Sequence, residues 1–162
     1  ELWLSLGDGI VAEADWPEPR ERIRAYDRER DLIETTRDDV RDITETTGAD
    51  PAEITLAVAP GWKYETLSDA LDAEGDAFDA AATEERVAEH GETVREYAGW
   101  LAANRQSLRK TLPPDREYEA LRRASWLLEK EFDADVRVLR AEEATAALRE
   151  AARPGKPGIE IG

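Results

Sequence analysis

Apolar side chains return at intervals of three or four residues along most of the chain, which is the spacing of one helix face. The clearest case, residues 27–47, is set by Leu32, Ile33, Thr36, Val40, Ile43 and Thr47. This pattern predicts an amphipathic helix that ends at Gly48. The same spacing predicts helices over residues 62–73, 92–110, 115–132 and 142–151, and one or two short helices over residues 76–91. Asp115 is the expected N-cap of the helix over residues 115–132.

Three short stretches alternate apolar and polar side chains instead, which is the pattern of a strand with one buried face. They are "EITLAVA" (53–59), "DVRVL" (135–139) and the closing "PGIEIG", in which Ile159 and Ile161 flank Glu160. Three strands of this length need helices packed across them to be stable. The sequence therefore predicts an α/β, or α+β, domain with a small three-stranded sheet and helices packed on it.

The first thirty residues have a different pattern. "ELWLSLG" is typical of the last turn of a helix, ended by Gly7 and Gly9, and an extended run follows up to Trp16 and Pro17. We expect residues 1–19 to be the end of a preceding helical domain, as in a piece of a longer protein, and residues 20–162 to form the domain proper. Residues 18–30 are almost all charged, which indicates a solvated helix or linker, so the compact part is expected from about residue 27.

The charge balance is strongly acidic, with 38 acidic and 22 basic residues and a formal net charge of −16. Such a balance is compatible with disorder or with a folded protein adapted to concentrated salt. The five tryptophans and the periodic stretches favour a folded protein. A surface rich in carboxylates and poor in lysine suits a cytoplasm with molar salt, where charges are screened within about 3 Å.

Several kinds of chemistry are excluded by composition. The chain has no cysteine and a single histidine, His90, so a thiolate metal site or a Ser-His-Asp centre within one chain is not expected. No nucleotide-binding loop occurs, and the acidic pairs are expected on the surface. We therefore predict no catalytic and no metal-binding residue, and His90 as a surface residue at a helix end. Without a membrane-spanning apolar run or a secretory pattern, a cytoplasmic location is expected.

Basic residues gather at three places: Arg105, Arg109 and Lys110; Arg122 and Arg123; and Arg149, Arg153 and Lys156. In the predicted helix over residues 92–110, Arg105 and Arg109 would share one face. Two interpretations stay open: charges that complement helix dipoles, or contacts to phosphates. Composition and spacing by themselves favour the dipole interpretation.

Three segments, taken together, resemble one family. "ELWLSLG…VAEADWPEP" resembles the end of the anticodon-binding domain of class I aminoacyl-tRNA synthetases. "ITLAVAPGWKYE" and the closing "KPGIEIG" resemble the C-terminal domain of leucyl-tRNA synthetases of the archaeal and eukaryotic-cytosolic type. Together with the salt-adapted composition, this resemblance implies a salt-loving archaeon as the source. The family's HIGH and KMSKS catalytic signatures do not occur in this chain, so we expect no catalysis by it and no cofactor in it, while the parent enzyme uses ATP and Mg²⁺.

The resemblance implies a function. In this family the C-terminal domain contacts the long variable arm of tRNA(Leu) and so supports leucylation and editing. Its closing segment meets unpaired bases at the tip of the arm. Carried over by position, the RNA-binding residues would be Arg153, Lys156, Pro157, Gly158, Ile159, Glu160 and Ile161. The few basic residues kept elsewhere join them as candidate contacts, namely Lys63, Arg105, Arg109 and Lys110. We expect partners in tRNA(Leu) and in the remainder of the synthetase, and a monomer.

A second hypothesis belongs to another class of protein. The chain would be a salt-adapted protein-interaction domain that docks on its synthetase or on another protein without touching RNA. Its surface would be Trp62, Tyr64 and Trp100. Core packing is the expected place of Trp100 and Trp126, whereas Trp62 is equally compatible with core and surface. Trimming residues 153–162 would separate the hypotheses, because only RNA binding is expected to depend on them.

Overall fold

The computed structural model describes residues 19–162, with side chains from residue 24 onward. These residues form seven α-helices and one three-stranded sheet, which confirms the predicted α+β class. The elements are α1 (Pro19–Thr47), β1 (Glu53–Ala57), α2 (Gly61–Asp72), α3 (Ala77–Ala81), α4 (Glu84–His90), α5 (Glu92–Ala103), a 3-10 turn (Arg105–Ser107), α6 (Pro114–Phe132), β2 (Asp135–Leu139), α7 (Ala146–Ala151) and β3 (Gly158–Ile161). The expected end of an anticodon-binding domain, residues 1–19, lies outside the described residues except for Pro19.

The sheet has the order β2-β1-β3, with β1 in the centre. β1 pairs in parallel with β2, so that Ile54 is opposite Val136, and antiparallel with β3, so that Leu56 is opposite Ile159. The closing segment is therefore an edge strand of the sheet and not a free tail. Its last residue is held as well, because the Gly162 carbonyl accepts hydrogen bonds from the Ala52 and Glu53 amides, 2.8 and 3.1 Å long.

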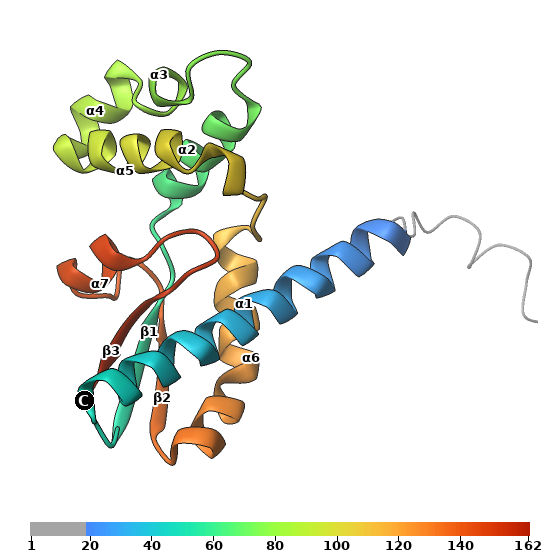
Figure 1. Ribbon diagram of the computed structural model, residues 1–162, viewed down its shortest axis with the longest axis vertical. Helices are drawn as coiled ribbons and strands as arrows, with labels where there is room; N and C mark the ends of the chain where they lie inside the picture. Colours follow the sequence, from blue (N-terminus) through green and yellow to red (C-terminus); the bar gives the residue numbers. More distant parts are fainter. Residues whose placement is uncertain (1–18) are drawn as a thin grey trace, which may run out of the picture.

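Helices cover both faces of the sheet (Figure 1). On one face, Ile54, Leu56 and Val58 join buried residues of α1 and α6 in the main hydrophobic core, and Ile159 and Ile161 pack against it. On the other face α7 contributes Leu148, which is buried with Ala57 and Ala144. Successive side chains of β1 thus point into two different cores, as expected for a strand buried on both faces. We call this part of the molecule the sheet lobe.

Helices α2–α5 form a second unit, the helical lobe, beside the sheet lobe (Figure 1). It has a separate core that contains Leu67, Tyr97, Leu101 and Leu108. The chain enters this lobe after β1 and leaves it along residues 108–113, on the way to α6. The helical lobe is therefore inserted between the two parallel strands β1 and β2.

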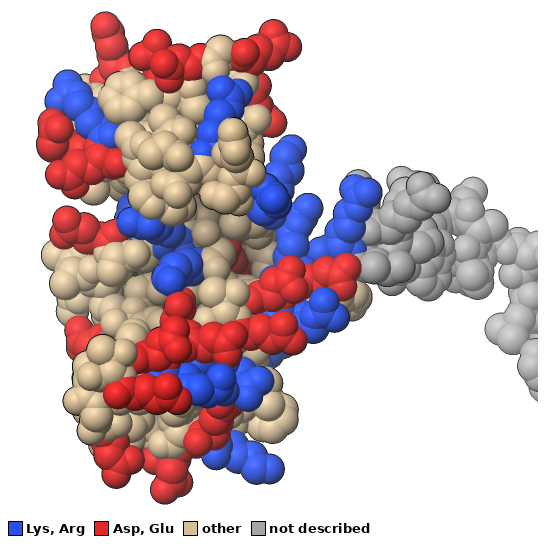
Figure 2. Space-filling model, in the orientation of Figure 1, with Lys and Arg blue, Asp and Glu red and all other residues tan. Residues whose placement is uncertain are grey.

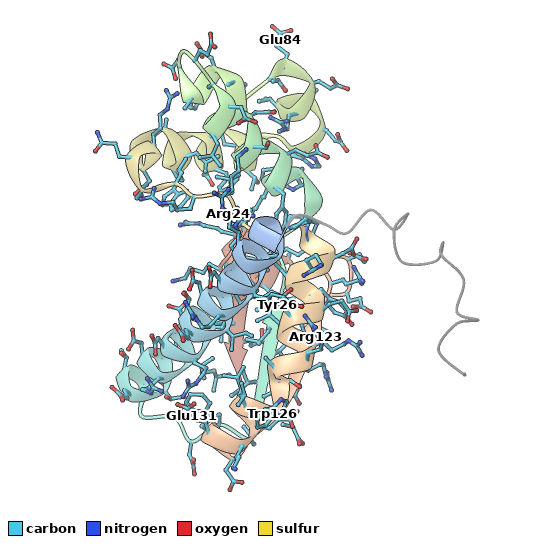
Figure 3. The ribbon with its side chains drawn as sticks, turned by 90° about the vertical axis from the view of Figure 1, so that its right-hand side faces the viewer. Arg24, Tyr26, Glu84, Arg123, Trp126 and Glu131 are labelled. Carbon is cyan, nitrogen blue, oxygen red and sulfur yellow. The ribbon has the colours of Figure 1, made fainter. Side chains whose placement is uncertain are left out.

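Ion pairs join α1 to α6, which lie side by side in Figure 3. Arg37 and Arg41 both donate to the Glu131 carboxylate, and the Arg37 Nε–Oε2 distance is 2.7 Å. Towards the other end, the buried Glu29 carboxylate accepts from Arg116 and Arg123 over 2.5 and 3.0 Å. The Glu29 contacts thus join the charged half of α1, which has few apolar side chains, to α6.

Several element boundaries differ from those predicted. α1 begins at Pro19, so the charged residues before 27 belong to the helix, and β1 ends at Ala57 instead of residue 59. α5 ends at Ala103 instead of residue 110, because the Asn104 side chain and backbone both donate to the Trp100 carbonyl and close the last turn. α7 begins at Ala146, four residues after its predicted start.

Two predictions about helix caps and cores are wrong. Asp115 is not the N-cap of α6, because the helix begins at Pro114, whose missing N–H suits the first helical position, and Pro113 precedes it. Trp100 and Trp126 were expected in the core, yet 36% of the Trp100 surface and 56% of the Trp126 surface are exposed. Small residues take the buried positions beside them, Ala98 in α5 and Ala124 in α6. Both tryptophans therefore belong to the surface of the molecule.

Candidate nucleic-acid interface

A tight turn, Arg153–Lys156, connects α7 to β3 at the level where the two lobes meet (Figure 1). The Arg153 amide donates to the Lys156 carbonyl over 2.8 Å, and the Lys156 amide donates back over 2.9 Å. Pro154 and Gly155 occupy the two central positions, and Gly155 has a φ of +76°, which glycine adopts without strain. The sequence Arg-Pro-Gly-Lys thus encodes a closed turn that carries a basic residue on each side.

A buried carboxylate of α6 holds this turn in place. Glu117 of α6 is 1% exposed, and it accepts a 2.7 Å hydrogen bond from the Gly155 amide and a 2.9 Å hydrogen bond from the Tyr64 hydroxyl. Burial raises the pKa of the Glu117 carboxyl to about 7, although both hydrogen bonds act in the opposite direction. Glu117 therefore ties together the turn, the helical lobe and α6.

Lys63 of α2 makes the second tie between the lobes. Its ammonium donates to the carbonyls of Arg149, Glu150 and Ala152, at 3.0, 2.8 and 2.7 Å. These are carbonyls at the C-terminal end of α7, where a positive charge is favourable. Burial, and then the nearby Arg153 charge, lower the pKa of Lys63 to about 8. Since Lys63 is 3% exposed and its ammonium is bound to three carbonyls, it has a structural role.

Aromatic rings line up along the helical lobe next to the turn. His90 stacks on Trp62 with ring centroids 5.0 Å apart, Tyr97 meets Trp62 edge-on, and Tyr97 stacks parallel to Trp100 at 6.1 Å. The row ends where the Arg153 guanidinium lies 4.2 Å above the Trp100 ring. Both α4 and α5 thus present rings towards α7 and the turn.

The rings form one wall of a groove between the lobes. Two adjoining hollows, of about 330 and 200 Å³, share Lys63, Thr93 and Glu150. We call them together the junction groove, which is lined mainly by Trp62, His90, Thr93, Glu96, Trp100, Arg149, Glu150 and Arg153. In Figure 2, several basic side chains lie at the level where the lobes meet, while elsewhere on the helical lobe and along α1 basic and acidic side chains are interspersed.

Arg149 and Arg153 differ from most arginines of the chain. Within residues 24–162, no ion pair or side-chain hydrogen bond joins either guanidinium to another residue. By contrast, Arg37, Arg41 and Arg86 are each bound to a carboxylate at short range. In a chain with a net charge of −16, two unpaired arginines on one groove indicate a surface that accepts a negatively charged or hydrogen-bonding partner.

Two more hollows meet at the same turn. One, of about 250 Å³, is lined by Arg28, Arg109, Lys110, Glu117 and Gly155, among others. The other, of about 450 Å³, lies between α1 and the closing segment and includes Lys156, Pro157, Gly158 and Ile159. The Lys156 ammonium is 3.0 Å from the Asp39 carboxylate of α1. Several of the predicted RNA-binding residues are thus brought together around the Arg153–Lys156 turn.

Other predicted residues have different surroundings. Arg105 donates to the carbonyls of Ala73 and Gly75 within the helical lobe, and it does not share a helix face with Arg109 because α5 has already ended. Arg109 donates to its neighbours' carbonyls, while Lys110 is exposed. Ile159 and Ile161 pack against the main core, so that Glu160 is the exposed side chain of β3.

Sequence reasoning missed three features of this surface. Glu117 was one carboxylate among many, and only its contact with Tyr64, 53 positions away in sequence, distinguishes it. Arg149 is one of several basic residues in the sequence, and no local pattern assigns it to the site. His90 does end a helix, yet its stacking on Trp62 was not predicted. The Pro-Gly pair of the turn was the one available local signal.

No group of three or more histidine and acidic side chains in the described part of the chain is arranged to hold a metal ion. Among the helices of residues 19–162, none combines the length and apolar character needed to cross a membrane.

Comparison with known proteins gives a consistent result, although no protein-family model matches the chain. Leucine–tRNA ligase of Halobacterium salinarum is 44% identical over 163 residues, which cover 99% of this chain and 18% of the relative. The same enzyme of Aeropyrum pernix is 31% identical over 98% of the chain, and that of Methanothrix thermoacetophila is 27% identical over 99%. The chain spans about a fifth of the length of these relatives.

The sequence match along nearly the whole chain places it among aminoacyl-tRNA synthetases, as a portion of such an enzyme. Within that class it belongs to the leucine–tRNA ligase family, which fits the resemblance to the C-terminal part of these enzymes.

Proposed function

We propose that this chain is a tRNA-recognition domain of a leucine–tRNA ligase, and that it contacts the long variable arm of tRNA(Leu). By holding the tRNA it would support leucylation and editing elsewhere in the enzyme. The observation that carries the proposal is the junction groove, where two unpaired arginines lie beside Trp62 and Trp100. Exposed rings and guanidinium planes are what proteins use to bind unpaired bases of RNA.

The variable arm fits this surface better than a regular duplex does. A duplex is recognised mainly through its phosphates, which calls for a broad basic surface. This chain has isolated basic side chains set among carboxylates, and concentrated salt weakens phosphate contacts further. Unpaired bases, which offer edges and faces, suit a groove that contains rings, arginines and carboxylates.

The proposed RNA-binding residues are those around the turn and the groove. They are Arg109, Lys110, Arg149, Arg153 and Lys156, together with Trp62 and Trp100. Pro157, Gly158, Ile159 and Ile161 contribute by fixing the turn on the edge of the sheet, and Glu160 remains an exposed candidate. Arg105 is left out because its donors are bound within the helical lobe.

The rest of the proposal follows from the enzyme family. The chain would act in the cytoplasm of a salt-loving organism, as a monomer joined to the remainder of its synthetase. We propose no cofactor for the chain itself, whereas ATP and Mg²⁺ would serve the catalytic part of the enzyme.

A protein-docking function has one observation in its favour. Trp126 on α6 and Tyr26 on α1 are 56% and 64% exposed, and Figure 3 shows both on the side of the molecule formed by these helices. Exposed tryptophan and tyrosine are common at protein interfaces. This surface differs from the docking surface expected from the sequence, which was Trp62, Tyr64 and Trp100. In that set, the Tyr64 hydroxyl is bound to buried Glu117. It can serve docking on the body of the synthetase beside an RNA-binding groove.

Binding of the full chain to tRNA(Leu) in concentrated KCl tests the proposal. The matched RNA is the same tRNA with its variable arm shortened. We expect the shortened RNA to bind at least about tenfold more weakly, because each lost stacking contact is worth about 1–3 kcal/mol. Equal binding of both RNAs, or no binding of either, would contradict recognition of the arm by this chain.

Point variants suit this test better than removal of residues 153–162. Removal would delete β3, which pairs with the central strand, and would confuse unfolding with loss of binding. The double variant Arg149→Ala/Arg153→Ala should lose the preference for the long arm. Arg122→Ala, which changes an exposed arginine of α6 paired with Glu119, is the control and should keep it.

A further inference from the structure

We propose that one unpaired nucleobase stacks on the Arg153 guanidinium, which Trp100 supports from behind, and that the site favours bases with an exocyclic amino group. This inference rests on the proposed RNA-binding function and names the ligand of one part of the junction groove. It would make Arg153 a stacking platform for a base and not a phosphate contact.

The Arg153 guanidinium lies against an aromatic pair of α5. The group lies 4.2 Å from the centre of the Trp100 ring, and Tyr97 stacks on the same tryptophan with an interplanar angle of 7°. The guanidinium thus lies over a ring of a stacked aromatic pair, an arrangement that favours arginine beside aromatic groups. Tyr97 is buried, so the stack is anchored in the core of the helical lobe.

Arg153 and Trp100 are both part of the groove. Arg153 and Trp100 both line the hollow of about 200 Å³, and 36% of the Trp100 surface is exposed. No carboxylate is bound to Arg153 within residues 24–162, so no ion pair has to break before a ligand stacks on it. The turn fixes the backbone of Arg153 through two hydrogen bonds to Lys156, which lowers the entropy lost on binding.

The charges of the hollow select a base over a phosphate. Glu96 of α5 and Glu150 of α7 line the same hollow and are both exposed. Two carboxylates repel a phosphate, but their oxygens accept hydrogen bonds from the amino groups of adenine, cytosine and guanine. Uracil has no amino group, and its one Watson–Crick donor, N3–H, lies between two carbonyl oxygens that carboxylates repel. A base with an amino group can therefore stack on the Arg153 guanidinium and also donate hydrogen bonds to the Glu96 and Glu150 carboxylates.

The test uses the full chain in concentrated KCl and two long-armed tRNA(Leu) transcripts, one natural and one with uridines at the unpaired tip of the arm. The key variant is Arg153→Lys, which keeps the charge and loses the planar group. We expect it to bind the natural RNA about tenfold more weakly and to bind the uridine RNA as the unchanged chain does. Trp100→Ala should behave in the same way, and Trp126→Ala, which removes an exposed tryptophan elsewhere, should have no effect.

A second readout reports stacking directly. Tip bases are replaced one at a time by 2-aminopurine, whose fluorescence falls when the base stacks on a neighbouring plane. One position should be quenched when the unchanged chain binds and should regain its fluorescence with Arg153→Lys. A role of Arg153 in folding alone would not produce that recovery at a single position.

The outcomes separate this inference from the function on which it rests. If the chain prefers the long arm, yet Arg153→Lys binds both tips as the unchanged chain does, the function stands and the stacking site is wrong. The same conclusion follows if Arg153→Lys weakens both tips equally, because the arginine would then act as a charge. If the chain does not distinguish long from short arms, the proposed function and the inference both fall.

Discussion

Lys63 shows how a single residue can be misjudged from sequence. A lone lysine in an acidic chain indicates a phosphate contact, but its ammonium binds three carbonyls at the end of α7 and is 3% exposed. Sequence gives the charge of a side chain and not the partners that folding brings to it. Those partners lie 86 to 89 positions away, so no local pattern reveals them.

The first prediction concerns this contact. Lys63→Met keeps the apolar length of the side chain but leaves three carbonyls without their donor. We expect the free energy of unfolding to fall by about 2–3 kcal/mol, since unsatisfied buried polar groups cost about 1–3 kcal/mol. Denaturant unfolding in concentrated KCl measures it. Lys130→Met changes an exposed lysine at the end of α6 and should leave stability within about 0.5 kcal/mol. Equal stability of the two variants would contradict the structural role of Lys63.

The second prediction is a pH dependence from Glu117. Its folded pKa of about 7 lies above the usual value of 4.5, so between these values the folded state keeps a proton that the unfolded state releases. Its contribution to stability is therefore complete below pH 4.5 and is lost as the pH rises to about 7. The loss reaches about 3 kcal/mol, from 1.36 kcal/mol for each pKa unit.

Glu117→Gln isolates this effect, because the amide does not titrate and can still bond to the Gly155 amide and to Tyr64. The unfolding free energy of the unchanged chain minus that of the variant should decrease between pH 4.5 and 7.5. Subtraction removes the titration of the many surface carboxylates. A difference that stays constant with pH would show that Glu117 is ionised throughout this range.

At the scale of elements, periodicity predicted the type of nearly every helix and strand. The three strands were found because each alternates cleanly, and α1 and α6 because their apolar stripes persist over many turns. The ends of the helices were harder to predict. The apolar spacing continues past Ala103, for example, although Asn104 already ends α5. Leu108 fits the stripe of α5 and is buried in the same core, although the chain reaches it through a 3-10 turn.

The close contact of β3 with α7 gives the third prediction. A Cβ atom on Gly158 would lie 2.4 Å from the Leu148 carbonyl oxygen, so Gly158→Ala must push the strand and the helix apart. We expect it to lower the free energy of unfolding by about 3 kcal/mol. Gly99→Ala is the control, because a Cβ there meets nothing within 4 Å and the residue lies inside α5. Alanine favours a helix interior by up to about 1 kcal/mol over glycine.

Thermal unfolding of both variants measures the difference. Gly158→Ala should unfold at a lower temperature than the unchanged chain, and Gly99→Ala at an equal or higher one. If Gly158→Ala unfolds at the same temperature as the unchanged chain, β3 can move away from α7 at little energetic cost. The Arg153–Lys156 turn would then be held by Glu117 more than by β3.

At the scale of the whole molecule, the charge of −16 sets the response to salt. The fourth prediction is that the unfolding temperature rises between about 0.1 and 1 M KCl, as the screening length falls from about 10 to 3 Å and self-repulsion is suppressed. The ion pairs between α1 and α6 oppose this trend, but surface pairs contribute little individually.

A charge variant serves as the control for this prediction. Glu45→Lys/Glu129→Lys exchanges two exposed carboxylates for ammonium groups, on α1 and α6. Its unfolding temperature should rise less with KCl than that of the unchanged chain. Identical slopes would indicate that salt acts by strengthening apolar burial and not by screening.

The place of the helical lobe between β1 and β2 has a consequence during synthesis. The ribosome completes β1 early, but neither of its partners exists until the helical lobe and α6 have been made. At about 5–20 residues per second, the strand waits several seconds with both edges open, and longer still for β3. Unpaired strands of this kind invite association between neighbouring nascent chains.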